Sequence, residues 1–208
     1  MSKIRSKHFL SAGLFLGLCA NMPALAQDAS SAKPATGIIS EALIADFQDM
    51  MSSPVVIASV KAANEKRKGL SQAEINDLDQ TWRAERESDG AQPYIAEALG
   101  SPVSTFLLRK QAVSKGLLAE LFVMDLQGLN VGQSSVTSDF WQGDEDKFLK
   151  TVPYGAGTVF VDEFEYNDEF GIWLAQVNFT LEDEGAVIGS ATIEVNLTEL
   201  ERRRELGL

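Results

Sequence analysis

The sequence contains only one cysteine and one histidine among its 208 residues, and both lie within the first 26. The rest of the chain therefore excludes disulfides, thiol nucleophiles, histidine-dependent triads and zinc sites built from cysteine and histidine. A fold without such cross-links depends on an ordinary hydrophobic core, and about 180 residues are enough to form one. We expect a single domain that has no cofactor and is not an enzyme.

The first residues also lack acidic side chains. An apolar run at 9–20 follows three basic residues, Lys3, Arg5 and Lys7. A membrane-spanning helix needs about 20 apolar residues, so this run is too short to anchor the chain. Ala24 and Ala26 then form the Ala-x-Ala pattern that signal peptidase recognises. We expect residues 1–26 to be a signal peptide cleaved after Ala26, which makes the mature protein periplasmic.

Cys19 raises the alternative of a lipoprotein signal. Lipidation requires a small residue directly before the cysteine, and Leu18 stands there. We therefore expect the mature chain to be free of lipid.

Basic residues are scarce, with 18 against 30 acidic ones and a net charge of −12. Removal of residues 1–26 takes away three basic and no acidic side chains, so the mature charge is 15 − 30 = −15. Nucleic-acid binding generally needs clustered lysine and arginine, and an acidic surface repels phosphate. We expect no nucleic acid as a partner.

The first half of the chain has the signals of helices. Residues 27–36 are small and polar without an apolar period, which predicts a disordered leader before a single domain at 37–208. Helix start and stop signals then fill 37–116. One predicted helix starts at Ser53-Pro54 and ends at Gly69, and a second starts with a capping box formed by Ser71 and Glu74. Two further helices are predicted at Pro93–Leu99 and 102–115.

The second half, 117–200, has the signals of strands. Five runs of strand type are separated by turns: 121–125, 129–131, 159–166, 172–181 and 186–197. In the fourth run Ala175 and Val177 alternate with Gln176 and Asn178, as expected for a sheet with one apolar and one polar face. Helices followed by an antiparallel five-stranded meander predict an α+β fold.

Four segments between Leu121 and Leu200 occur in the order and spacing of a known family. They are 122–128, 142–145 with Phe148, 157–162, and 184–189 leading to 193–197. Together they resemble the extracytoplasmic PAS-like sensor domains known as Cache or PDC domains. The resemblance implies a PAS-like sheet and a small-molecule pocket between that sheet and the loop that joins the second and third strands. It implies binding and not turnover.

The sequence departs from the resemblance in two ways. Members that bind carboxylates typically present arginine or histidine to the ligand, yet no arginine or histidine lies between Arg109 and Arg202. This puts a carboxylate ligand in doubt. Such domains also usually belong to membrane receptors, whereas this sequence shows no membrane helix or output domain after the last strand. We therefore expect a separate membrane receptor or histidine kinase as partner.

Six residues are the candidates for ligand binding. Aromatic side chains wall many small-molecule pockets, and the polar tips of Trp141 and Tyr154 need partners, so for these two we place the pocket role ahead of the core alternative. The remaining four are Gln142, Asp144, Asp162 and Gln176. We place the core alternative ahead for Phe140 and Phe160.

Acidic residues crowd the same region, with Asp139 and 144–146 in the loop and Asp162 and Glu163 on the third strand. Hard cations such as calcium take oxygen ligands, but the spacing does not fit the twelve-residue calcium loop. A run of acids is more often a solvated helix start. We expect no metal site and favour a cationic organic ligand held by Asp162.

These observations predict a soluble periplasmic small-molecule-binding sensor that acts with a separate membrane signalling partner. The alternative is a structural or assembly factor that has a Cache-like fold without a ligand pocket. The sequence also leaves open a homodimer through the N-terminal helices.

Overall fold

The computed structural model describes residues 32–208. The predicted signal peptide lies outside the described residues. Part of the predicted leader is packed on the domain, because Pro34 is buried and Lys33 Nζ lies 5.8 Å from the ring centre of Trp173. Within the described part, no helix is both long enough and apolar enough to span a membrane.

Five helices precede all the strands, as the sequence predicts, but a helix that the sequence did not predict also follows the last strand. The helical half contains α1 (Glu41–Met51), α2 (Pro54–Arg67), α3 (Gln72–Arg86), α4 (Pro93–Leu99) and α5 (Pro102–Val113). The second half contains β1 (Leu118–Met124), β2 (Asn130–Gln133), α6 (Asp146–Leu149), the 3-10 helix η1 (Val152–Tyr154), β3 (Val159–Val161), β4 (Glu165–Asn167), β5 (Ile172–Asp183), β6 (Ala186–Asn196) and α7 (Leu197–Leu206). The α+β fold class is confirmed.

The sheet is antiparallel with the strand order β2-β1-β6-β5-β3, and β4 also pairs with β5. The prediction of a meander is wrong, because the last strand, β6, lies in the middle between β1 and β5. In this position β6 pairs on both edges, which suits a strand whose Ala191, Ile193 and Val195 are fully buried.

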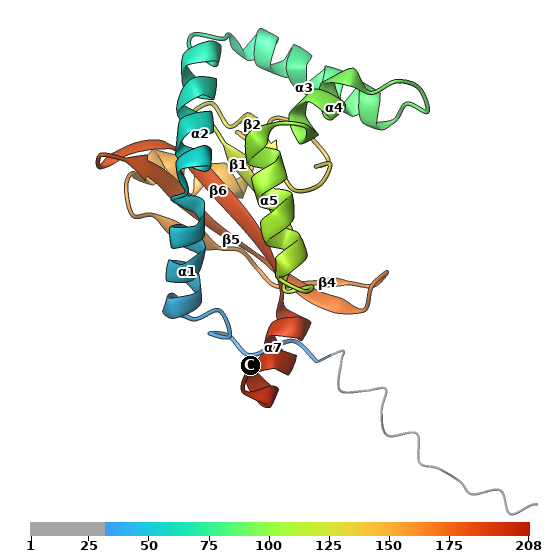
Figure 1. Ribbon diagram of the computed structural model, residues 1–208, viewed down its shortest axis with the longest axis vertical. Coiled ribbons are helices and arrows are strands. Elements are labelled where there is room, and N and C mark those ends of the chain that lie inside the picture. The colour runs from blue at the N-terminus through green and yellow to red at the C-terminus, as the bar shows by residue number, and fades with distance from the viewer. Residues whose placement is uncertain (1–31) are drawn as a thin grey trace, which may run out of the picture.

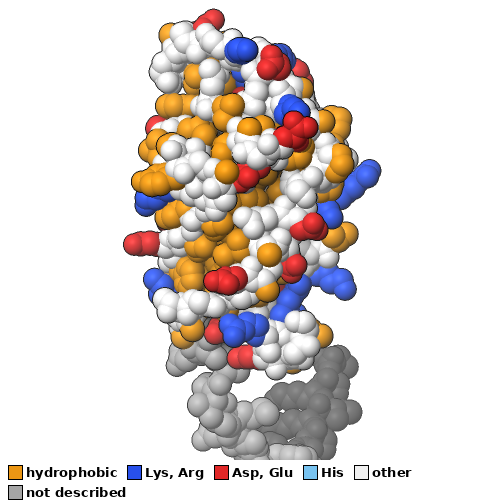
Figure 2. Space-filling model, turned by 90° about the vertical axis from the view of Figure 1, so that its left-hand side faces the viewer, with side chains coloured by type: hydrophobic (Ala, Val, Ile, Leu, Met, Phe, Trp, Pro, Cys, Tyr) orange, Lys and Arg blue, Asp and Glu red, His pale blue; other side chains and the backbone are white. Residues whose placement is uncertain are grey.

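Helices α1, α2 and α5 lie across one face of the sheet, α3 and α4 lie at one end, and α7 lies at the other (Figure 1). The main core fills the space between the helices and the sheet. Val56 and Val60 of α2 and Leu107 of α5 meet Val177 and Ile193 there. Figure 2 shows a band of hydrophobic side chains on the α1 and α2 side of the molecule.

The opposite face of the sheet is polar, as the alternation in β5 predicts, but much of it is buried. Asn178 and Thr192 are fully buried, and Thr192 Oγ1 donates to Asn178 Oδ1 at 2.7 Å. The segment between β2 and β3, residues 134–158, covers part of this face and packs Phe148 against Phe122 and Met124. We call this segment the lid.

The run 159–166, predicted as one strand, is divided into β3 and β4. The pairing with β5 shifts by one residue between Val161↔Val177 and Glu165↔Leu174, so the edge carries one extra residue, as in a β-bulge. The bulged segment includes Asp162 and Glu163, which both line the cleft described below.

Candidate functional site

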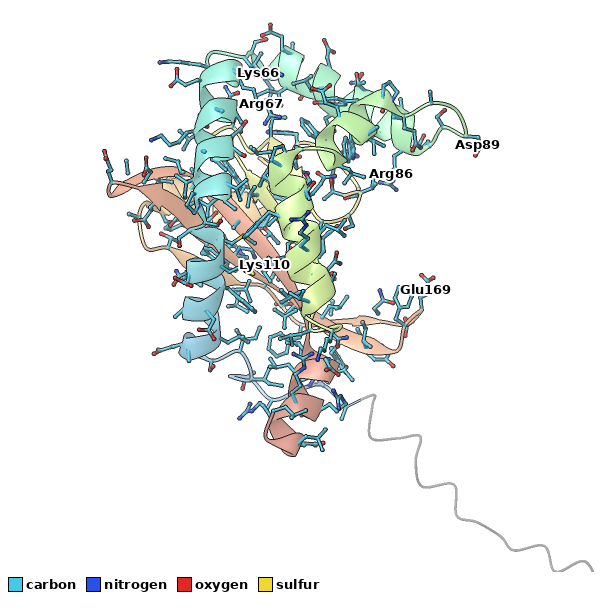
Figure 3. The ribbon with its side chains drawn as sticks, in the orientation of Figure 1. Lys66, Arg67, Arg86, Asp89, Lys110 and Glu169 are labelled. Atoms are coloured by element: carbon cyan, nitrogen blue, oxygen red, sulfur yellow. The ribbon has the colours of Figure 1, made fainter. Side chains whose placement is uncertain are left out.

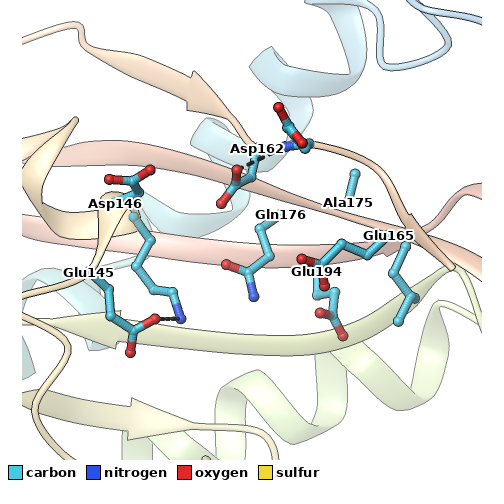
Figure 4. Close-up of a pocket in the computed structure, with 10 residues that line it drawn as sticks. Glu145, Asp146, Asp162, Glu165, Ala175, Gln176 and Glu194 are labelled. Carbon is cyan, nitrogen blue, oxygen red and sulfur yellow. Dashed lines mark hydrogen bonds and ion pairs between the residues drawn. The ribbon is translucent and has the colours of Figure 1, made fainter. Parts of the chain in front are cut away.

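A cleft of about 270 Å³ lies between the lid, the β3–β4 bulge and the polar face of β5 and β6 (Figure 4). Ten residues line it: Glu145, Asp146, Lys147, Asp162, Glu163, Glu165, Leu174, Ala175, Gln176 and Glu194. Six of the ten are carboxylates and one is a lysine. We call it the acidic cleft.

The basic residues around the acidic cleft form ion pairs with only two of these carboxylates. Lys147 Nζ lies 2.8 Å from Glu145 Oε2, and Lys150 Nζ lies 2.7 Å from Asp146 Oδ2. Among the described residues, no lysine or arginine lies within 4.0 Å of the carboxylates of the other four, which are Asp162, Glu163, Glu165 and Glu194. The cleft therefore carries an excess of negative charge.

Lys147 shows how this site holds an ammonium group. Its Nζ donates to Gln142 Oε1 at 3.1 Å, pairs with Glu145, and lies 5.4 Å from the ring centre of Phe122. Gln142 is fully buried, and its Nε2 donates to the backbone oxygen of Asp139. A carboxylate, an amide oxygen and an aromatic face thus surround one cation.

Two half-buried glutamates face each other beside the cleft. Glu120 of β1 and Glu194 of β6 are direct partners in the sheet, and Gln176 of β5 is the next partner of Glu194. Burial raises the pKa of both glutamates, and the Glu120 carboxylate raises that of Glu194 further. Hydrogen bonds from Ser135 to Glu120 and from Gln176 to Glu194 oppose these shifts. A positive charge placed here would stabilise the ionised pair.

The structure brings Asp162 and Gln176, two of the six candidates, together in the acidic cleft. Gln142 contacts the cleft through Lys147. Trp141, Asp144 and Tyr154 do not line it. Asp144 is exposed, and Tyr154 is 74% exposed at the surface of the lid.

Trp141 packs inside the lid instead. Its Nε1 donates to the backbone oxygen of Gln127 at 2.8 Å, and its ring lies against Gly143. Its neighbour Phe140 belongs to the hydrophobic cluster around Trp82. Asp79 Oδ1 accepts hydrogen bonds from the backbone NH groups of both Phe140 and Trp141. These contacts attach the start of the lid to α3.

Sequence reasoning missed Glu120, Lys147, Glu165 and Glu194 as site residues. Glu194 gave no local signal, because a polar residue between Ile193 and Val195 is what an alternating strand with one polar face predicts. Within residues 32–208, no group of three acidic, cysteine or histidine side chains is placed to hold a metal ion.

No protein-family model matches the chain, and no curated protein matches its sequence. Among solved structures, it is similar to the sensory domain of the Campylobacter jejuni chemoreceptor Tlp3, with 8% identity, 77% of this chain and 65% of that chain covered, and a TM-score of 0.38. It is also similar to the ligand-binding domain of the Pseudomonas aeruginosa PAO1 chemoreceptor PctC in complex with GABA, at 12% identity, 78% and 63% coverage, and a TM-score of 0.35.

A third similar structure is the sensor domain of the Vibrio cholerae histidine kinase DctB, with 16% identity, 77% and 58% coverage, and a TM-score of 0.35. All three are Cache/PDC-type sensor domains, the type that the sequence resembles. The chain spans less than two thirds of the length of each.

Proposed function

We propose that this chain is a periplasmic ligand-binding domain whose acidic cleft binds a small organic cation. The observation that carries the proposal is the set of four carboxylates around the cleft that form no ion pair with a lysine or arginine of the described residues. Among these four, Glu194 is half-buried and burial raises its pKa, so a bound cation would lower the cost of ionising it.

The shape of the cleft supports a small ligand with more than one polar nitrogen. Its volume of about 270 Å³ is just below the usual range for pockets that take drug-sized molecules, so the ligand must be small. The carboxylates come from the lid, the bulge, β4 and β6, so more than one side of the cleft offers a negative partner. We therefore expect an amine with two nitrogens, such as putrescine, to pair with Glu194 at one end and with Asp162 at the other.

Binding at this place suits a sensor. The ligand would contact both the lid and the sheet and so hold them together, and β6 continues directly into α7. Stabilising one lid position is how a ligand shifts a conformational equilibrium. We propose that a separate membrane receptor or histidine kinase reads this change. The polar lining of the cleft favours this function over that of an assembly factor without a ligand.

A thermal-shift screen tests the proposal with putrescine, ethanolamine, calcium chloride and succinate at matched ionic strength. A ligand at 100 times its Kd stabilises the folded state by about 2.7 kcal/mol. For a domain of this size that raises Tm by about 5 to 10 °C. We expect the organic amines to raise Tm and succinate to have no effect. If only succinate raises Tm, the proposed ligand class is wrong.

A further inference from the structure

A second cavity, of about 420 Å³, lies between the C-terminal end of α2, helices α3 and α4, and the edge strand β2. It shares no lining residue with the acidic cleft. Its walls are largely apolar and come from the side chains of Leu70, Leu78, Tyr94, Ala98, Val131 and Phe140. Figure 3 shows Lys66 and Arg67, which also line it, at this end of α2.

Arg67 forms a rigid side of this cavity. Its Nη1 donates to Asp125 Oδ2 at 2.7 Å, its Nη2 donates to the backbone oxygen of Asn130 at 3.0 Å, and its guanidinium lies 5.2 Å from the ring centre of Phe140. Asp125 is fully buried and is held in turn by the backbone NH groups of Gln127 and Leu129. The charge of Arg67 is therefore already neutralised.

The remaining charges of the lining also balance. Lys66 is positive and Glu97 is negative, and both are exposed at the rim. Because Asp125 neutralises Arg67, the lining of the cavity has no net charge that would attract an ion. A charged ligand in these apolar walls would lose hydration without compensation, so the cavity favours a neutral molecule.

Two polar groups of the lining lack partners among the described residues. The side chain of Tyr94 is half-buried, its hydroxyl forms no hydrogen bond with the described residues, and burial raises its pKa to about 12. Asn130 is 1% exposed, and its Oδ1 has no hydrogen-bond partner. A buried polar atom such as Asn130 Oδ1 usually has a partner, and a ligand hydroxyl beside Tyr94 can supply hydrogen bonds here.

We propose that this cavity is a second binding site, and that it takes a small neutral aromatic alcohol of the phenol type. The ring would lie against Leu70, Leu78 and Phe140, and the ligand hydroxyl would form a hydrogen bond with that of Tyr94. This site is independent of the cation site in the acidic cleft.

The test is a set of three matched probes, p-cresol, toluene and 4-hydroxybenzoate, titrated into the ¹⁵N-labelled protein and followed by amide chemical shifts. We expect p-cresol to move the amides of residues 66–70, 94–98 and 130–131. Toluene, which lacks the hydroxyl, should bind several-fold more weakly, and the 4-hydroxybenzoate anion should bind weakest because of its charge.

Three variants test whether p-cresol binds specifically in this cavity. Tyr94→Phe should weaken p-cresol about fivefold, the worth of one neutral hydrogen bond, and leave toluene unchanged. Leu78→Trp, which fills the space, should abolish binding of both. Asp162→Asn in the acidic cleft should change neither, and urea titrations verify that each variant is folded.

The proposal is overturned if p-cresol leaves these amides unmoved or if Tyr94→Phe weakens toluene and p-cresol alike. It is also overturned if 4-hydroxybenzoate binds as well as p-cresol, or if Asp162→Asn removes binding.

Discussion

The carboxylates of Glu120 and Glu194 face each other on adjacent strands, and burial raises the pKa of both above the ordinary value. Between the pKa of each glutamate in the unfolded state and its higher pKa in the folded state, the folded state binds more protons. The free energy of unfolding therefore falls as the pH rises through this window. We expect Glu194→Gln to raise the urea midpoint at pH 7, because it removes a charge that the fold disfavours. At pH 4, where unfolded glutamate is largely protonated, the gain should vanish.

Glu205→Gln, at an exposed position near the end of α7, is the matched control and should change neither midpoint. A lower midpoint of Glu194→Gln at pH 7 would contradict this account of the pair.

Gly143 leaves the space that the indole ring of Trp141 occupies. A Cβ at residue 143 would lie 2.4 Å from Trp141 Nε1, so the indole would have to move and would lose its hydrogen bond to Gln127. We expect Gly143→Ala to destabilise the protein by about 1 to 3 kcal/mol, measured by urea unfolding. Gly90→Ala, where a Cβ meets only the exposed Ser88 Oγ at 3.2 Å, should be nearly neutral. Equal effects of the two substitutions would show that the Trp141 contact is unimportant.

Among the elements, α3 depends on its capping box. Ser71 Oγ accepts from the backbone NH of Glu74, and Glu74 Oε2 accepts from the backbone NH of Ser71. We expect Ser71→Ala to cost about 1 kcal/mol in urea unfolding, because one of these bonds is lost and an amide is left unpaired. Ser53 occupies the same position before α2 but makes no capping hydrogen bond, so Ser53→Ala should cost little. A similar loss for both variants would contradict the capping argument.

Features that depend on neighbouring residues could be predicted from the sequence, whereas features that depend on distant residues could not. Helix starts such as Pro54, Ser71 and Pro93 are set by neighbouring residues, and the structure confirms them. The central place of β6 depends on pairing with β1, which is about 70 residues away, and no local signal encodes it. Glu194 lies beside Glu120 and Gln176 because of pairings across the sheet that its neighbours in sequence do not encode, whereas Asp162 could be identified from its acidic neighbours.

For the whole molecule, the sequence predicts cleavage after Ala26 and a mature chain that starts at Gln27. Such a chain would keep Pro34, which is buried in the domain. We expect mass spectrometry of the protein purified from the periplasm to give the mass of residues 27–208 without a lipid. A retained 1–26 segment, or a lipid on Cys19, would contradict the predicted signal peptide.

The proposed function rests on cation binding in the acidic cleft, and a putrescine titration followed by amide chemical shifts tests it most directly. The account predicts shifts at 162–165, Gln176 and Glu194, and a roughly tenfold loss of affinity in Glu194→Gln, since a charged hydrogen bond is removed. Asp144→Asn removes an acid of the same lid that lies outside the cleft and should leave the affinity unchanged. Equal losses in both variants, or shifts confined to other parts of the chain, would contradict the central claim.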